Sequence, residues 1–451
     1  KSLGGTFDMQ GEVPSEGKLS PAKEKANEKG MQGRLRIHDV QVGRLLKVLG
    51  ATTERNVSGT LNVDVSYTHD TPDRMPRGSG TIRLAGVQWS DALIAENIQG
   101  DVVLADGQLR IRDLEGVLAN GTIMGQLTYY FRERDRSWFT VRLESVDTER
   151  LLAPWFDQKI KGPIQARIRG KMGPVWHGSA DIQFARGNVS GLEIGEFRIP
   201  ANWSFAPDQG HAKIEIAETS GRIARGNAKG KLSLAWQNGA RVDGYLRLDR
   251  VELTEFMRET VGKSDLVAGQ TTAVLQVKGA NVRSLKDLEG KLVASFQQAQ
   301  ALQLPVLSQI TPFLGIGATT TFQQGNLVAR LNRGTAKIEQ MTLRGRNAQI
   351  FVNGTISLEE RMNLNVVAKT TDIGWPTLRL GPIGLRLPVA GPVPLVVAEE
   401  VTRLISNQVV YLDVTGTPRS PVIRPRPLPI LSAEAIRFFL TEANLPVTLN
   451  P

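Results

Sequence analysis

GRLRIHDVQVGRLL, residues 33–46, joins a strand-like alternation to a short amphipathic segment, and the chain repeats this junction twice. The second copy is FTVRLESVDTERLL at 139–152, and the third is YLRLDRVELTEFM at 245–257. Each copy carries an arginine four residues before a valine, as in Arg36 and Val40, and the junctions recur at intervals of about 105 residues. The sequence therefore predicts one structural unit that is read three times.

Alternating apolar and polar residues follow each junction. In GTLNVDVSY, which starts at Gly59, every second side chain from Leu61 to Tyr67 is apolar and the side chains between them are polar. GPIQARIRG, which starts at Gly162, has the same period of two. Because successive side chains of a strand point to opposite faces, this pattern predicts an antiparallel sheet with one apolar face and one face in water.

Short amphipathic helices are expected directly after the junctions, at Val42–Gly50, Thr148–Phe156 and Leu253–Gly262. They are too short to be stable alone, so we expect them to lie against the sheet as lids. A fourth candidate lid is Leu304–Leu314. The lid residues are predicted to be Leu45, Leu46, Leu49, Leu151, Leu152, Trp155 and Phe256.

The predicted fold is mainly β: an elongated, curved antiparallel sheet of about three repeated modules, with short amphipathic helices and a C-terminal helical cap. Strand patterns and turn residues outnumber helical patterns, and the 45 glycines and 23 prolines fit many short strands. The expected segments are the tail of a preceding module with a charged loop (1–33), module 1 (34–138), module 2 (139–243), module 3 (244–372), and a proline-rich segment with the cap (373–451).

Composition and motifs argue against catalysis. The chain has no cysteine, and its four histidines, at 38, 69, 177 and 211, lack metal-ligand spacing. GKS at 262–264 lacks the earlier glycine of a phosphate-binding loop, and no pair of acids recurs at corresponding positions. The net charge is +10, but basic and acidic residues are interleaved along the chain, and no run of basic residues contains interleaved aromatic residues. Nucleic acid is therefore not an expected partner. We expect no enzyme activity, no cofactor and no metal.

The run LEGKLVASFQQAQALQLPVLSQITPFLG and the following TTTFQQGNLVARLNRGTAKIEQMTLRGRNAQIFVNGTISL resemble the C-terminal region of AsmA-like proteins, relatives of TamB and of repeating-β-groove lipid-transfer proteins. The resemblance covers 265–425 best and the rest more loosely. It implies a periplasmic protein, anchored in the inner membrane, that takes part in outer-membrane biogenesis. No stretch approaches the roughly 20 apolar residues of a membrane helix, so we expect that anchor in a part of the protein before Lys1.

What the resemblance implies about function is a groove that conducts phospholipid, or another lipid with acyl chains, between the inner and outer membranes. The anchor and the C-terminal cap are the expected contacts with the two membranes, and protein partners in the envelope are possible. The groove would be lined by Leu61, Val63, Val65, Ile164, Ile168, Ile214, Ile216, Leu232, Leu234, Leu364 and Val366.

Alternation alone is also compatible with a closed core and a different function. The same apolar faces can close onto the short helices or onto each other, which would make the chain a structural scaffold or a protein-interaction module of the envelope. A carbohydrate-active β-helix is disfavoured because neither short coils nor paired carboxylates are visible.

Overall fold

The structure, a computed structural model, confirms a mainly β protein built on one open antiparallel sheet of 23 strands with few helices. It describes residues 4–12, 31–48, 57–69, 75–89, 92–152, 160–189, 191–237, 239–261, 267–300, 321–346, 348–370, 409–417 and 420–425. The expected loop at 14–31 lies outside these ranges except for Met31, and so do the fourth lid at 304–314 and most of the expected cap.

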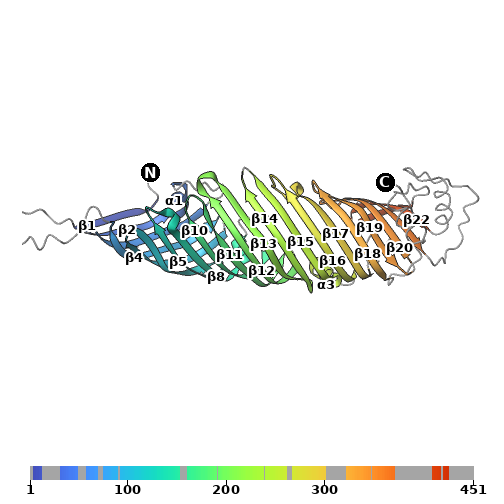
Figure 1. Ribbon diagram of the computed structural model, residues 1–451, viewed down its shortest axis with the longest axis horizontal. Helices are drawn as coiled ribbons and strands as arrows, with labels where there is room; N and C mark the ends of the chain where they lie inside the picture. The colour runs from blue at the N-terminus through green and yellow to red at the C-terminus, as the bar shows by residue number, and fades with distance from the viewer. Residues whose placement is uncertain are drawn as a thin grey trace, which may run out of the picture. The chain divides into compact units, whose positions relative to one another are not determined.

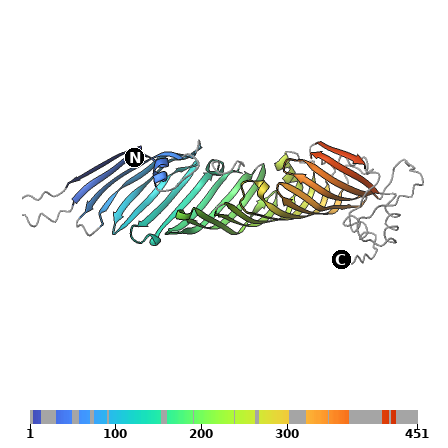
Figure 2. The same ribbon diagram turned by 90° about the horizontal axis from the view of Figure 1, so that it is seen from above.

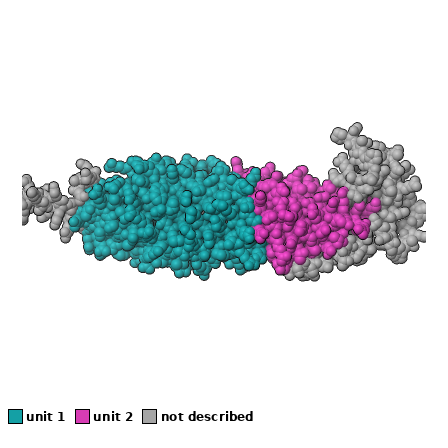
Figure 3. Space-filling model, turned by 60° about the horizontal axis from the view of Figure 1, so that its bottom comes forward, with its two compact units in different colours: residues 1–221, 231–237 teal, residues 222–230, 238–451 magenta. Residues whose placement is uncertain are grey.

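The chain divides into two compact units, which Figure 3 colours separately. Unit 1 comprises residues 1–221 and 231–237, and unit 2 comprises residues 222–230 and 238–451, so the division passes through strands β13 and β14. Each unit is described by itself below.

In unit 1, the chain from β1 to β12 forms a meander in which nearly every strand pairs with the next one (Figure 1). The exception is β9, a two-residue strand that pairs with the last two residues of β11. Strand β8 therefore pairs with β10. The strands are β1 (Thr6–Glu12), β2 (Met31–Gln41), β3 (Val57–His69), β4 (Arg77–Trp89), β5 (Ala92–Ala105), β6 (Gln108–Leu118), β7 (Gly121–Tyr130), β8 (Ser137–Asp147), β9 (Ile160–Lys161), β10 (Pro163–Met172), β11 (Trp176–Val189), β12 (Leu192–Ala206), β13 (His211–Ile223) and β14 (Gly226–Trp236).

Unit 2 continues with the same order of neighbouring antiparallel pairs from β15 to β23 (Figure 2). Its strands are β15 (Ala240–Glu252), β16 (Ala268–Gly279), β17 (Glu289–Gln300), β18 (Phe322–Asn332), β19 (Thr335–Gly345), β20 (Ala348–Ser357), β21 (Met362–Thr370), β22 (Val409–Thr417) and β23 (Ser420–Pro425).

Three α-helices follow the three junctions: α1 (Val42–Val48) after β2, α2 (Thr148–Leu152) after β8 and α3 (Leu253–Val261) after β15. Each agrees in position with a sequence-predicted helix and ends at or before the predicted last residue. Short 3-10 turns lie at η2 (Arg134–Arg136), η3 (Pro207–Gln209) and η4 (Leu285–Asp287).

The three junctions share a local geometry. A residue with positive φ, at Asp39, Ser145 or Arg250, forms a bulge at the end of the strand, and a fully buried valine follows it one residue later. The bulge shifts the register and bends the strand. The chain leaves the sheet there and enters the helix.

Two hydrophobic clusters form the described core. In unit 1 the cluster gathers around Val146, Ile164 and Phe184, with Leu151 of α2 packed against it. In unit 2 it spans β18 to β22, with Leu253 and Met257 of α3 packed against it. Both clusters therefore lie where a helix covers the sheet.

Candidate functional site

One face of the sheet in unit 1 is apolar without interruption. We call the residues that face one another on successive strands a rung. One rung crosses every strand from β1 to β12 except β9, and a parallel rung crosses β2 to β12 with the same exception. In strand order the first contains Met9, Leu35, Val65, Gly80, Val102, Ile111, Leu127, Phe139, Gly170, Gly178 and Trp203, and the second contains Val40, Leu61, Leu84, Ile98, Gly116, Ile123, Leu143, Ala166, Ile182 and Ile199.

Unit 2 has rungs of the same kind from β15 to β23. Bulges between paired strands, such as the one after Leu248, keep the apolar residues in phase where the strand itself shifts. In strand order one rung contains Leu246, Leu275, Leu292, Ala329, Ile338, Gly354, Leu364, Val414 and Ile423, and the next contains Leu248, Ala273, Ala294, Leu327, Met341, Val352, Val366, Leu412 and Pro425.

The opposite face of unit 1 is polar and charged. Arg34 donates two hydrogen bonds to the Asp64 carboxylate, at 2.7 Å and 2.6 Å, which lower the pKa of Asp64. Arg198 makes the same bidentate contact with Asp181 at 3.2 Å and 3.0 Å. These cross-strand pairs lie in water, so they set the register and solvate the face more than they stabilise it.

Exposure differs along the apolar face. Most of its residues in unit 1 are half-buried, including Leu61, Val63 and Ile168, although no second layer of described strands covers them. Toward the end of unit 2 the face is closed: Leu364 is 6% exposed and Val366 is 2% exposed, inside the core cluster. The apolar side chains of unit 1 can therefore contact a ligand, whereas those around β21 are already covered by other residues of the protein.

The predicted groove-lining residues all lie in strands. Leu61, Val63, Val65, Ile164, Ile168, Leu364 and Val366 belong to rungs of the apolar face. Those of unit 1 are brought together on one surface. Ile214 and Ile216 on β13 and Leu232 and Leu234 on β14 are half-buried.

The predicted lid residues are only partly described. Leu45, Leu152 and Phe256 are half-buried in α1, α2 and α3, and Leu151 packs on the unit 1 cluster. Leu46 lies in α1 with its side chain outside the described part, and Leu49 and Trp155 lie outside the described residues altogether.

Aromatic rings span the apolar face near one of its edges. Phe139 and Trp203 stack with centroids 5.9 Å apart, and Gly170 and Gly178 lie beneath them. A Cβ at Gly170 would come within 2.6 Å of the Phe139 ring and 2.7 Å of the Trp203 ring, so only glycine leaves room for the stack. Sequence reasoning missed this feature because it depends on the register between four strands.

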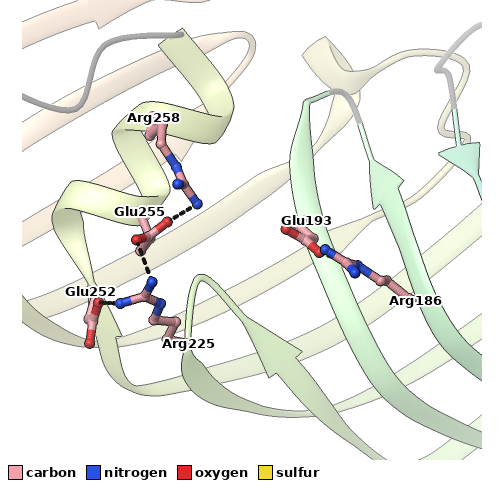
Figure 4. A network of polar contacts seen from close by, with 6 residues as sticks. All are labelled: Arg186, Glu193, Arg225, Glu252, Glu255 and Arg258. Carbon is pink, nitrogen blue, oxygen red and sulfur yellow. Dashed lines mark hydrogen bonds and ion pairs between the residues drawn. The ribbon is translucent and has the colours of Figure 1, made fainter.

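Ion pairs attach α3 to the sheet in unit 2. Arg225, in the turn between β13 and β14, contacts Glu252 at 3.3 Å and Glu255 at 3.1 Å, and Arg258 also pairs with Glu255 (Figure 4). The Glu255 side chain is 10% exposed, so it is held between the two arginines. The contact fixes the first turn of α3 over the strand end.

The described residues contain no cluster of histidine, cysteine or carboxylate side chains able to hold a metal ion, and none of their helices is long and apolar enough to cross a membrane. No protein-family model matches the chain, and no curated protein and no solved structure is similar to it. Alternation in the sequence predicts an apolar face, and the strand register of unit 1 shows one that is continuous.

Proposed function

We propose that the protein is a non-enzymatic lipid-binding protein whose apolar face binds and conducts the acyl chains of phospholipids. The observation that carries the proposal is the continuity of the apolar rungs across unit 1, together with their half-exposed side chains. Each methylene that the face removes from water contributes about 0.8 kcal/mol, so contact with part of one acyl chain favours the bound state.

Movement of a lipid along the face follows from the similarity of successive strands within each rung. Neighbouring strands present similar side chains, Leu61 next to Leu84 and Ile98 for instance, so a bound chain meets similar contacts at each step. No deep trap separates one position from the next, and the polar opposite face keeps the sheet in water. These are the properties that a conducting groove requires.

The proposal extends to the finer architecture and to the location. The recurrence of bulge, buried valine and helix at α1, α2 and α3 supports three repeated modules with helices as lids. The resemblance to AsmA-like proteins supports the periplasm of a double-membraned bacterium, an inner-membrane anchor and a role in outer-membrane biogenesis. The C-terminal cap remains part of this proposal.

Photo-crosslinking tests the proposal with a matched pair of positions. Ile168 points to the apolar face, and Arg169, the next residue on β10, points to the opposite face. We expect a benzophenone side chain at 168 to capture phospholipid from the cell extract and one at 169 to capture none, as read by mass spectrometry. Equal yields at both positions, or no lipid at 168, contradict the proposal.

A scaffold with a closed core is the second candidate, and the buried cluster of unit 2 favours it there. Phe322, Ile350 and Val414 are each 0% exposed, so the centre of this cluster offers no surface to a ligand. A benzophenone at 364 is expected to remain without lipid under both hypotheses. Lipid at 168 but not at 364 confines binding to the half-exposed part of the face.

A further inference from the structure

Exposed aromatic side chains gather at one edge of unit 1. Phe131, Trp176 and Phe205 are 39%, 36% and 39% exposed, and Trp176 meets Phe205 edge to face at 6.3 Å. They lie where β7, β11 and β12 end or begin at turns, with the exposed Val175 beside them. We call these four residues the aromatic edge.

Arginines accompany this edge. The turn after β7 reads FRERDR, and the guanidinium groups of Arg132 and Arg134 make no hydrogen bond or ion pair with any described residue. Only Arg136 in this turn has an acidic partner, Glu133 at 2.7 Å. The turn lies next to the turn that carries Val175, since a Cβ at Gly173 would meet Asp135 at 3.6 Å. Free cations and exposed aromatic rings therefore share one edge.

A polar group on the apolar face next to this edge lacks a partner. The Trp203 indole nitrogen is buried and makes no hydrogen bond with any described residue. Trp203 lies one rung inward of Trp176 and Phe205. A buried donor without an acceptor is costly, and the ester carbonyls of a phospholipid are acceptors of the right kind.

We propose that the aromatic edge of unit 1 lies against an anionic phospholipid bilayer and is the place where lipid reaches the apolar face. Aromatic rings favour the boundary between headgroups and acyl chains, and arginines attract the phosphates. The Trp203 indole then donates to an ester carbonyl while the acyl tails continue over the deeper rungs. This inference rests on the proposed function, because it names the surface from which the face is filled.

The absence of native cysteine makes a direct test possible, since one introduced cysteine carries one label. Val175→Cys places an environment-sensitive fluorophore on the aromatic edge, where Val175 is 48% exposed. Val117→Cys is the matched control: Val117 is 39% exposed at the other end of the strands, close to the turn between β6 and β7. With the full chain and vesicles of phosphatidylcholine and phosphatidylglycerol, we expect a blue shift at 175 and none at 117.

A double variant tests how much the charge of the two arginines contributes to vesicle binding. Arg132→Ser combined with Arg134→Ser should raise the lipid concentration needed for half of the response at 175 by about 30-fold, which corresponds to about 1 kcal/mol per arginine. Arg167→Ser, which removes an exposed arginine of β10 without a partner in the described residues, should leave it unchanged. Vesicles of phosphatidylcholine alone should give a weaker response.

Equal shifts at 175 and 117, no shift at 175, or an equal effect of Arg167→Ser overturns the proposal of a bilayer contact. The benzophenone at 168, with lipid supplied from micelles, separates this failure from failure of the proposed function. Lipid captured at 168 without a shift at 175 refutes the edge alone, whereas no lipid at 168 refutes the lipid-binding face.

Discussion

A single charge on the apolar face should interrupt lipid contact locally. Ile168 lies on β10 between Val141 of β8 and Ala180 of β11, half-buried in a rung of the apolar face. Ile168→Lys removes the part of the isoleucine that is buried, which costs about 1 kcal/mol of stability, and the lysine stem keeps some contact with its apolar neighbours. We therefore expect the variant to fold.

The effect on lipid should be larger than the effect on folding. A lysine in the middle of hydrocarbon costs about 2.5–3.5 kcal/mol. Because the half-exposed face lets the ammonium reach water, we expect about 1.5–3 kcal/mol here. That lowers the population of acyl chains beside residue 168 by roughly tenfold to 150-fold. Crosslinking from a benzophenone at Val141, opposite Ile168 on the neighbouring strand, measures this population.

A distant position and an outer-face charge complete the design. A benzophenone at Val63 reports whether the rest of the face still fills, and Gln165→Lys adds the same charge to the exposed face of β10. Crosslinking at 141 should fall in Ile168→Lys and stay unchanged in Gln165→Lys. If both lysines act equally, or if Ile168→Lys keeps the wild-type yield in a folded protein, the apolar face does not hold lipid at this place.

Three further outcomes concern stability. Arg225→Ala should cost about 1 kcal/mol in urea unfolding and speed hydrogen exchange in α3. Arg186→Ala removes the more exposed pair of Arg186 with Glu193 (Figure 4) and should cost less than about 0.5 kcal/mol; equal costs would contradict the role of the α3 contact. Lys291→Thr should raise stability by about 0.5 kcal/mol in thermal unfolding, because Lys291 faces Arg330 directly across one strand pair and the neutral Gln276 across the other; an unchanged or lower melting temperature contradicts this. Burial raises the pKa of Tyr411 to about 12, so its stabilising effect is complete below pH 10 and is lost as the pH rises toward 12. Tyr411→Phe should flatten this alkaline loss of about 1–2 kcal/mol in urea titrations at pH 9 and pH 12, and a variant with the wild-type pH profile rules Tyr411 out.

Period-two alternation made the sheet and its apolar side predictable from the sequence. The helices α1, α2 and α3 were predictable because each follows a junction whose apolar spacing changes from two to that of a helix. Asn353 and Gly354 show the limit: this dipeptide is typical of a tight turn or of a bulge, and here Gly354 has positive φ inside β20. A dipeptide indicates backbone freedom without saying whether the chain reverses.

The rest depends on register, which local sequence does not encode strongly. Nothing near Arg225 in the chain indicates its contact with Glu255, and nothing near Gly170 indicates the rings of Phe139 and Trp203. The aromatic edge had a readable signal in FRERDR, but its mixed charges resemble an ordinary solvated turn. Neighbouring turns must be placed side by side before the pattern becomes visible.

An even count of strands has a consequence for how such a chain can change length over evolution. Between α1 and α2 the meander consists of β3 to β8, so the chain returns to the same edge of the sheet before each helix begins. Duplicating or deleting these six strands leaves every apolar residue on the apolar face, and it changes the length of the sheet by roughly 29 Å at about 4.8 Å per strand. That increment is close to the roughly 30 Å hydrocarbon thickness of a bilayer. Selection can thus lengthen or shorten the sheet in fixed steps without redesigning its two faces.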